Sequence, residues 1–439
     1  MSRVGETERS GTGQVLGSIP PLSEETPFAT MMSAFDEAAE ALKIEPDIYG
    51  VLRKPDREVQ VAVPVRRDNG RVEVLDGFRV QHNMGLGPFI GPLQISPDLR
   101  LDELRAVAAW MTWKCALLAI PFGGASGGIR LPREEFSQGE LERAVRRYVS
   151  ALVGMVGADR DVFTPQRSSD EKLMGWVMDT MSSHQRHTSN AVVTGKPQVM
   201  AGSHHSSDAI AQGLAVVLAL ALAHHGGTNS SGGPRVIVQG AGTVGGRLAR
   251  LLHAGGYRVI GLSDVHGGYL DEGGLDVPAL LEWSAKNGSL KEAQGRFKRV
   301  TNAELLLEPC DVLVPCAVAN VITAHNAAGV RARLVVEGAH APVGPRADRI
   351  LHERGIPVVP DILANAGGIV VGYFEWVQNR QGFSWQAEDV LQRLQRFMTE
   401  AWEAVTRVQQ ERGVRLRTAA NMLAVSRVAQ AHKLRGLYA

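Results

Sequence analysis

The chain has 439 residues, with 47 Lys and Arg against 46 Asp and Glu, so its formal net charge is +1. This balance argues against a general binder of nucleic acid, because such proteins usually carry a basic surplus that displaces counterions from phosphates. Hydrophobic residues make up 44% and charged residues 21%, which excludes disordered and fibrous classes, and the length fits two or three domains of about 150 residues.

The N-terminal segment, Met1–Ser18, is rich in Gly, Ser, Thr and Glu and has no apolar core. We therefore expect a flexible lead rather than a signal peptide. The longest apolar run, Gly213–Ala223, is shorter than the roughly 20 residues that cross a bilayer, and it predicts a buried helix. The few cysteines fit no disulfide framework or common zinc spacing, and we expect reduced core residues: Cys115, Cys310 and Cys316. These features predict a cytoplasmic protein that does not bind membranes.

The first part of the chain predicts a helix and then a β-hairpin. After a polar entry, apolar residues recur at helical spacing from Met31 to Ile44. Val59–Val63 alternates and predicts a strand that Pro64 ends, and a return strand is expected at Val72–Val80. The turn between them is Asp68-Asn69-Gly70.

Two further helices are expected before the middle of the chain. The first covers Leu101–Leu118 and stops at Pro121-Phe122-Gly123-Gly124, and the second covers Glu140–Val156. Together with the hairpin, these helices predict an α/β domain in the front half.

The segment Gly226–Pro234 is the clearest loop in the sequence, and the pattern after it changes to strand, turn and helix units. Short apolar strands are expected at Arg235–Gln239, Tyr257–Leu262, Asp311–Pro315, Leu334–Glu337 and Val358–Pro360, with a helix at Arg247–Ala254. This order predicts a parallel, doubly wound sheet. From Trp385 onward the chain reads as helix to the end.

A glycine-rich turn follows the first of these strands. Gly240, Gly242 and Gly245 come between a strand and a helix, and Asp264 ends the next strand. In this context the glycines let a pyrophosphate approach the helix N-terminus, and the acid accepts from ribose hydroxyls, which favours NAD over NADP. The alternative is a domain of the same shape that has lost its cofactor.

Seven short motifs follow one another along the chain. They are Gln81-His82-Asn83, Met111-Thr112-Trp113-Lys114, Pro121-Phe122-Gly123-Gly124-Ala125, Val193-Thr194-Gly195-Lys196-Pro197, Ala364-Asn365-Ala366-Gly367-Gly368, Tyr373-Phe374-Glu375-Trp376-Val377-Gln378-Asn379 and Arg417-Thr418-Ala419-Ala420-Asn421. With them the chain resembles the glutamate dehydrogenase family, which also holds leucine, phenylalanine and valine dehydrogenases. The resemblance runs from about Glu40 to the C-terminus.

The resemblance implies an α/β fold with two domains. A substrate and oligomerisation domain is expected over residues 25–205, with residues 375–439 returning to it, and a Rossmann-type dinucleotide-binding domain over residues 206–374. It also implies hexamers assembled through the first domain. The implied cofactor is NAD, although the resemblance leaves its retention open, and the implied binding residues are Gly240, Gly242, Thr243, Val244, Gly245, Asp264, Asn320 and Asn365.

The chemistry that the resemblance implies is hydride transfer from the amino-acid Cα to the nicotinamide, followed by hydrolysis of the imine. The family carries a lysine in a glycine-rich loop, P-F-G-G-A-K-G-G-I, and a carboxylate in D-x-P-A-P-D. Here these positions hold Ser126 and Gln166. Serine supplies no positive charge, and glutamine exchanges no proton near neutral pH, so we expect no intact catalytic residue.

Other departures fall around the same pocket. Leu86, Ile90 and Gln94 stand where the family has basic residues, and the lysine at the position of Ile90 holds the substrate's distal carboxylate. Gly372 replaces a serine, the nicotinamide side reads Ala209-Ile210-Ala211, and His340 replaces an asparagine. Lys114, which meets the α-carboxylate in the family, is present. The expected amino-acid or effector pocket is therefore Ile90, Lys114, Ser126, Gln166 and Gly372.

The sequence therefore predicts a non-catalytic, regulatory subunit of a glutamate dehydrogenase, assembled with a catalytically complete paralogue. It resembles the regulatory subunits of hetero-oligomeric glutamate dehydrogenases of thermophilic bacteria. The apolar pocket predicts a branched-chain effector such as leucine. Two alternatives stay open, namely an active NAD-dependent amino-acid dehydrogenase with an aliphatic substrate, and a sensor without a dehydrogenase partner. No metal is expected at the adjacent His204 and His205.

Overall fold

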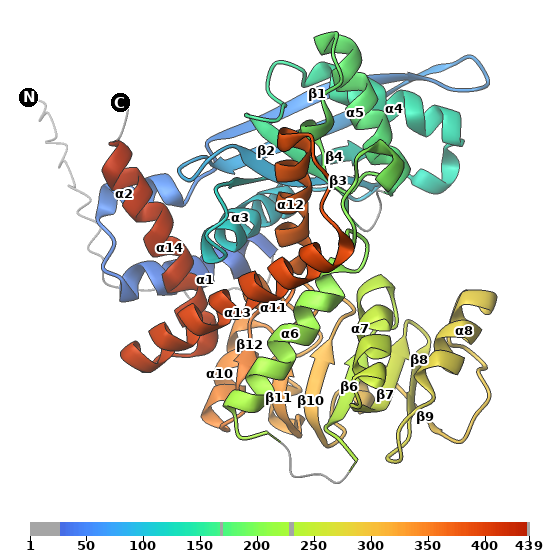
Figure 1. Cartoon of the computed structure of the whole chain (residues 1–439), viewed down its shortest axis with the longest axis vertical. Coiled ribbons are helices and arrows are strands. Elements are labelled where there is room, and N and C mark those ends of the chain that lie inside the picture. The colour runs from blue at the N-terminus through green and yellow to red at the C-terminus, as the bar shows by residue number, and fades with distance from the viewer. Residues whose placement is uncertain (1–26, 167–169, 228–231, 437–439) are drawn as a thin grey trace, which may run out of the picture.

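The structure is a computed structural model that describes residues 27–166, 170–227 and 232–436. Figure 1 shows two β-sheets in separate parts of the molecule, one built from the front of the chain and one from its middle. This confirms the predicted α/β class with two domains. The predicted N-terminal lead lies outside the described residues, as does the centre of the predicted loop at 226–234.

The first sheet has five strands in the order β1-β2-β4-β3-β5. Their bounds are β1 Arg57–Arg66, β2 Val72–Asn83, β3 Phe89–Ser96, β4 Gly123–Arg130 and β5 Asp161–Thr164. The β1-β2 and β2-β4 pairs are antiparallel, while β3 runs parallel to β4 and β5. Helix α3 (Leu101–Leu117) packs on one face, and α4 (Gln138–Ala151) and α5 (Glu171–Gln185) pack on the other.

The predicted hairpin is present, but the predicted end of its first strand is wrong. Pro64 lies inside β1, opposite Val74 of β2. A proline is tolerated there because β1 is an edge strand, so its missing N–H leaves no partner unpaired on the open side. The first helix begins and ends earlier than expected: α1 covers Pro27–Ala41, Lys43 takes a positive φ of 53°, and α2 follows at Pro46–Leu52.

The glycine-rich segment that was expected to be a loop is a central strand, β4. Helix α3 stops before Pro121 as predicted, but the chain becomes extended again at Gly123. Glycine is needed because α3 lies directly on the strand: a Cβ on Gly124 would stand 2.1 Å from the carbonyl oxygen of Ala108. The neighbouring strand β3 was not predicted.

The second sheet has seven strands in the order β12-β11-β10-β6-β7-β8-β9. Their bounds are β6 Arg235–Gln239, β7 Arg258–Asp264, β8 Gly267–Leu270, β9 Lys298–Val300, β10 Cys310–Pro315, β11 Ala332–Val336 and β12 Val358–Val359. All five predicted strands are present and parallel. The sheet is mixed rather than wholly parallel, because only Val265 and His266 separate β7 from β8, which permits antiparallel pairing alone.

Both faces of this sheet are covered, as a doubly wound fold requires. Val236 and Val238 of β6 face the core shared with α6 (Ala209–His224) and α7 (Thr243–Ala254). Ile237, between them, faces the opposite core, which α9 (Asn302–Leu305) and α10 (Pro345–Glu353) complete. Helix α8 (Val277–Asn287) lies near the antiparallel edge (Figure 1). The apolar run at 213–223 is confirmed as a helix, α6.

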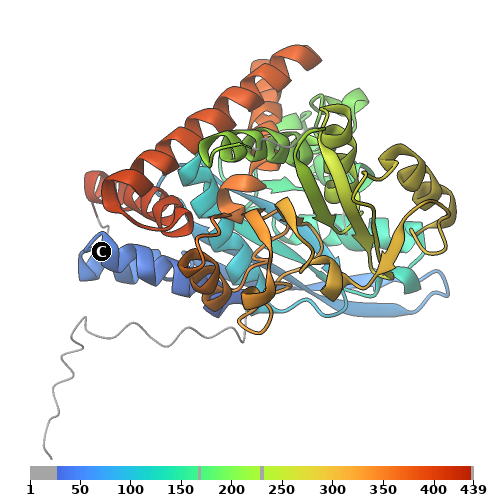
Figure 2. The same cartoon turned by 90° about the horizontal axis from the view of Figure 1, so that it is seen from below.

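The C-terminal helices return to the first sheet, as predicted. After α11 (Asp361–Ala364) and α12 (Gly367–Gln381), the long α13 (Ala387–Arg412) leads into α14 (Leu416–Arg435), which packs against α1, α2 and α3 (Figures 1 and 2). Arg427 of α14 donates to the carbonyl oxygens of Ala116 and Leu117, at 2.7 and 2.6 Å, at the end of α3. Short 3-10 turns lie at Arg133–Glu135, Asn190–Val192, Gln198–Met200 and Ala327–Gly329.

The three cysteines are buried and form no disulfide, as expected. Among the described residues, no helix combines the length and the apolar character that a membrane span requires.

Candidate functional site

The glycine-rich turn lies where the strand order of the second sheet reverses. Strand β6 has β10 on one side and β7 on the other, and a crevice at such a point is where doubly wound sheets bind ligands. Gly240 takes a φ of +100°, which a side chain disfavours, and a Cβ on Gly245 would stand 1.9 Å from the Gly240 oxygen. The turn therefore requires glycine at both positions.

The start of α7 is open to a ligand. Gly242 is the N-cap of this helix, makes no side-chain cap and has no neighbour where a Cβ would point. Gly242 and Thr243 are exposed, and Val244 is half-buried. Uncapped N–H groups and the helix dipole favour an anion here, so these residues fit the diphosphate of a dinucleotide.

Asp264 ends β7 beside this turn. Its carboxylate accepts from the backbone N–H groups of His266 and Leu290, at 2.8 and 2.6 Å. An ionised carboxylate offers about four acceptor positions, so the side chain is held in place with capacity left for ribose hydroxyls. Across the crevice, Asn320 is exposed at a φ of 54°, and its N–H donates to the oxygen of Ala341 at 3.0 Å.

Lys114 joins the two halves of the molecule. Its Nζ donates to Asn365 Oδ1 at 2.6 Å and lies 3.3 Å from Nδ1 of His340. Lys114 comes from α3 on the first sheet, whereas His340 follows β11 and Asn365 caps α11 in the second part. Lys114 is buried, and desolvation lowers its pKa to about 8, although the nearby Asp361 opposes this shift.

Two further residues of the predicted pocket, Ile90 and Ser126, are neutral and lie on the first sheet. Ile90 on β3 and Ser126 on β4 are both fully buried. Ser126 Oγ accepts a hydrogen bond from Nε2 of Gln94 at 3.1 Å, and Ile90 packs in the same core as Trp113 of α3. Three positions at which the resemblance implies basic residues thus hold buried neutral side chains, two of which are hydrogen-bonded to each other.

Thr194 contacts both β5, which Gln166 follows, and Gly372 of α12. Gln166 follows β5 and is half-buried. Thr194 donates from its N–H to the oxygen of Phe163 in β5 at 2.8 Å. A Cβ on Gly372 of α12 would stand 3.3 Å from Thr194 Oγ1, so a serine at Gly372 would be in tight contact with that threonine. The predicted pocket residues therefore come from β3, α3, β4, the end of β5 and α12.

The sequence did not predict a buried ionic cluster behind this site. Glu337, at the end of β11, accepts from Arg417 at 2.8 Å and from the N–H of Asp361 at 2.8 Å. Burial raises the pKa of Glu337 to about 7, against the effect of Arg417. Arg415 pairs with Asp348 and Glu37, tying α14 to α10 and α1. The motif that contains Arg417 does not indicate this contact.

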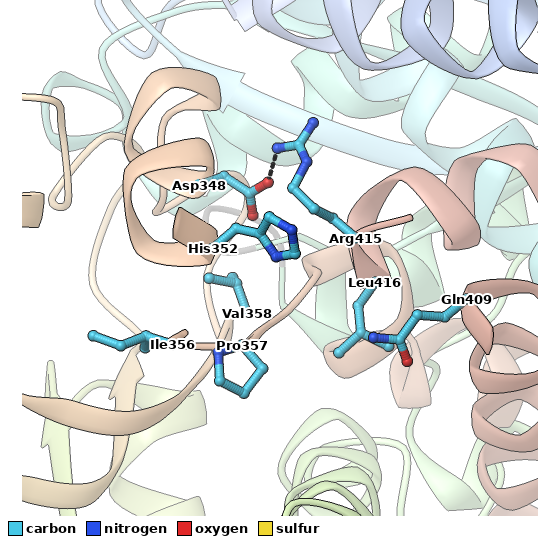
Figure 3. A pocket seen from close by; sticks show the side chains of 8 residues that line it. All are labelled: Asp348, His352, Ile356, Pro357, Val358, Gln409, Arg415 and Leu416. Carbon is cyan, nitrogen blue, oxygen red and sulfur yellow. Dashed lines mark hydrogen bonds and ion pairs between the residues drawn. The ribbon is translucent and has the colours of Figure 1, made fainter. Parts of the chain in front are cut away.

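A hollow of about 280 Å³ lies beside the Asp348–Arg415 pair, and Figure 3 shows the side chains that line it. Its wall consists of Asp348, His352, Ile356, Pro357, Val358, Gln409, Arg415 and Leu416. None of these is a predicted site residue, so the hollow does not form part of the candidate site.

His204 and His205 make local contacts. His204 Nδ1 lies 3.1 Å from Nε2 of Gln198, and His205 Nδ1 lies 3.5 Å from a carboxylate oxygen of Asp208. Over the residues that the structure describes, no three His, Cys, Asp or Glu side chains gather in a way that could hold a metal ion.

Comparison with known proteins matches two segments of the chain to one dehydrogenase family. Residues 201–436 match the family model Glutamate/Leucine/Phenylalanine/Valine dehydrogenase, and residues 55–183 match the Glu/Leu/Phe/Val dehydrogenase dimerisation domain. The chain is 41% identical to glutamate dehydrogenase of Thermotoga maritima over 95% of its length and 100% of that protein. It is 39% identical to the catabolic NAD-specific glutamate dehydrogenase of Bacillus subtilis, over 93% and 96%.

Solved structures agree with this result. A chain of the hetero-hexameric glutamate dehydrogenase from Thermus thermophilus, in its Leu-bound form, matches with a TM-score of 0.90 and 35% identity, over 96% of this chain and 100% of that one. Glutamate dehydrogenase from Peptoniphilus asaccharolyticus matches with a TM-score of 0.83 and 32% identity, over 94% and 100%.

Proposed function

This chain belongs to the Glu/Leu/Phe/Val dehydrogenase family, and on that premise we propose that it is a regulatory, catalytically impaired subunit of a glutamate dehydrogenase. In such a complex the partner subunit carries out the oxidative deamination of L-glutamate to 2-oxoglutarate. The observation that carries the proposal is Ser126, a neutral and fully buried side chain at the position of the family lysine. Its hydroxyl is already bonded to Gln94.

The loss of reaction rate expected from Ser126 and Gln166 supports an impaired subunit. Removing one placed electrostatic stabiliser costs about 3–4 kcal/mol of transition-state energy, or roughly 100- to 1000-fold in rate. Gln166, at the position of the family carboxylate, adds the loss of a general acid and base, typically worth about 100-fold or more. With both groups missing, the chain is left with binding groups rather than a reaction centre.

The binding groups that remain fit an apolar amino acid. Lys114 is placed to meet an α-carboxylate, while Ile90 presents hydrocarbon where a distal carboxylate would need a cation. A branched-chain amino acid such as leucine offers both features, and we propose it as the effector. The glycine turn at Gly240 and the open N-terminus of α7 support a retained NAD site, where NAD would supply hydride acceptance.

We further propose the domain limits 25–205 with 375–439, and 206–374, and assembly through the first domain. Strand β1 is the edge of the first sheet, so one row of its N–H and C=O groups has no partner within this sheet. Val72 and Val74 on the adjoining β2 are 58% and 63% exposed. A second chain of the same fold, here a catalytically complete paralogue, would cover this edge in a hexamer-type complex.

One observation favours a second candidate, an active NAD-dependent dehydrogenase for an aliphatic amino acid. The pKa of Lys114 is lowered to about 8, which would let this amine polarise water in place of the family lysine. In that case Lys114→Met would remove an activity that the chain shows on its own.

The test is an assay of NAD reduction with the purified chain alone, across a panel of amino acids, and then mixed with a catalytic glutamate dehydrogenase homologue. We expect no turnover alone, and a leucine-dependent change in partner activity in the mixture. Turnover alone, abolished by Lys114→Met, would establish the second candidate. Ile90→Lys provides the pocket control, since it should weaken the leucine effect while leaving assembly with the partner intact.

A further inference from the structure

The contact between Lys114 and His340 joins the two halves of the molecule. Lys114 is 4% exposed and comes from α3, whereas His340 is exposed and lies on the loop after β11. The ring of His340 lies 6.1 Å from that of Trp110, one turn before Lys114 on the same helix. The imidazole is therefore positioned by an aromatic neighbour with Nδ1 near the lysine amine, 3.3 Å away.

Two of the three hydrogen-bond donors of the Lys114 ammonium group face acceptors within the protein. An ammonium group has three donors. Asn365 Oδ1 takes one at 2.6 Å, and His340 Nδ1 is placed to take a second. Both acceptors belong to the second part of the molecule, so the same lysine that would meet a ligand carboxylate also holds the two parts together.

We propose that His340 is a positioning residue that competes with the ligand α-carboxylate for Lys114, so that ligand binding breaks a contact between the two halves of the molecule. This inference rests on the proposed function only in taking Lys114 as the carboxylate-binding group. A ligand that captures Lys114 removes one of the contacts that hold the loop after β11 on α3. Occupancy of the site thereby biases the relative placement of the two parts, which a partner subunit can sense.

Two variants of His340 separate the effect of its hydrogen bond to Lys114 from the effect of the volume of its ring. His340→Phe keeps the ring volume and the packing on Trp110 but removes the acceptor, while His340→Asn loses the ring and keeps an acceptor at the distance of Nδ1 from Cβ. The exposure of His340 makes both changes compatible with folding. The readout needs no ligand: the rate at which a small amine-reactive reagent labels Lys114 in the full-length chain, measured by peptide mass spectrometry. Lys196, buried and paired with Glu375, is the internal reference.

We expect Lys114 in His340→Phe to be labelled about ten-fold faster than in the wild type, the size of effect that one hydrogen bond to a charged group gives. The rate in His340→Asn should lie closer to the wild type. Equal rates in His340→Phe and the wild type, or faster labelling in His340→Asn than in His340→Phe, would overturn the inference in favour of a steric role.

A second arm measures leucine binding to the same three proteins by calorimetry. The inference expects His340→Phe to bind about ten-fold more tightly, and weaker binding in that variant would overturn it. If leucine binds to none of the three while the labelling order holds, the proposed effector is wrong and the hydrogen bond between Lys114 and His340 stands. If leucine binds equally to all three, the proposed effector stands and the competition is refuted.

Discussion

Gln94 donates a hydrogen bond from Nε2 to the Oγ of Ser126, at 3.1 Å, between neighbouring strands of the first sheet. Both residues are buried, and both stand where the resemblance implies basic side chains. Two buried polar groups that satisfy each other cost little, whereas one alone would be destabilising. The departures from the family pattern therefore form a compatible set rather than isolated losses. This pairing makes it hard to restore the chemistry one residue at a time.

The first prediction concerns Ser126→Lys. An ammonium group at this fully buried position faces Gln94 and the apolar Ile90, so we expect a loss of roughly 3 kcal/mol in the free energy of unfolding and no glutamate turnover. Urea unfolding and an assay of NAD reduction measure both. Ser126→Ala is the control, expected to lose about 1–2 kcal/mol because it leaves Gln94 unpaired. A Ser126→Lys variant with wild-type stability and measurable turnover would contradict the idea that this pocket has been reorganised.

The second prediction concerns the dinucleotide site. In Gly245→Ala the new Cβ would stand 1.9 Å from the Gly240 oxygen, so the turn at the start of α7 must shift. We expect the affinity for NADH, followed by nucleotide fluorescence, to fall by about ten-fold or more. Gly50→Ala is a matched control, since a Cβ there meets nothing within 4 Å. Unchanged NADH affinity in Gly245→Ala would show that the nucleotide does not bind at this turn.

The second sheet was predictable because its signals are local. Each parallel strand is a short apolar run buried on both faces, such as Val236–Val238, and the Gly240 turn follows directly after it. Strands β3 and β4 lack such a signal. The segment Gly123–Gly128 reads as a loop because glycine is rare in strands, yet α3 packs so closely that only glycine fits at Gly124. A tertiary contact thus overrides the local preference.

The sequence predicted which residues belong to the candidate site, but it did not predict the contacts between them. The resemblance placed Lys114 and Asn365 in motifs of the family pattern, and composition alone would have selected neither. The contacts of Lys114 with His340 and Asn365 join residues 226 and 251 positions apart, and no periodicity or spacing reports such a distance. The pairing of Arg417 with Glu337 was missed for the same reason.

The third prediction concerns the ion pair of Lys196 and Glu375. Both side chains are buried, with Nζ 2.5 Å from the carboxylate, which also accepts from the N–H groups of Gly195 and Ser203. Lys196→Met leaves a buried carboxylate without its counter-charge, so we expect a loss of about 3–5 kcal/mol in unfolding free energy. The double variant Lys196→Met, Glu375→Gln should lose less than Lys196→Met alone. Charge removal at the exposed pair of Lys286 and Glu282 should leave the urea midpoint unchanged. Equal losses in the single and double variants would argue against an uncompensated charge as the cause.

The fourth prediction concerns pH. Burial raises the pKa of Glu337 to about 7 from its usual value of 4.5, with Asp361 adding to the shift and Arg417 opposing it. Between these values the folded state binds more protons than the unfolded state, so this group makes stability fall as pH rises from about 4.5 to about 7, with no further change above. Glu337→Gln removes this pH-dependent contribution to the free energy of unfolding. The unfolding free energy of the variant relative to the wild type should therefore increase across this window and stay level beyond it. Urea titrations at intervals from pH 5 to 8 measure the difference, and a difference that is flat or decreasing across the window would show that Glu337 is already ionised in the folded state.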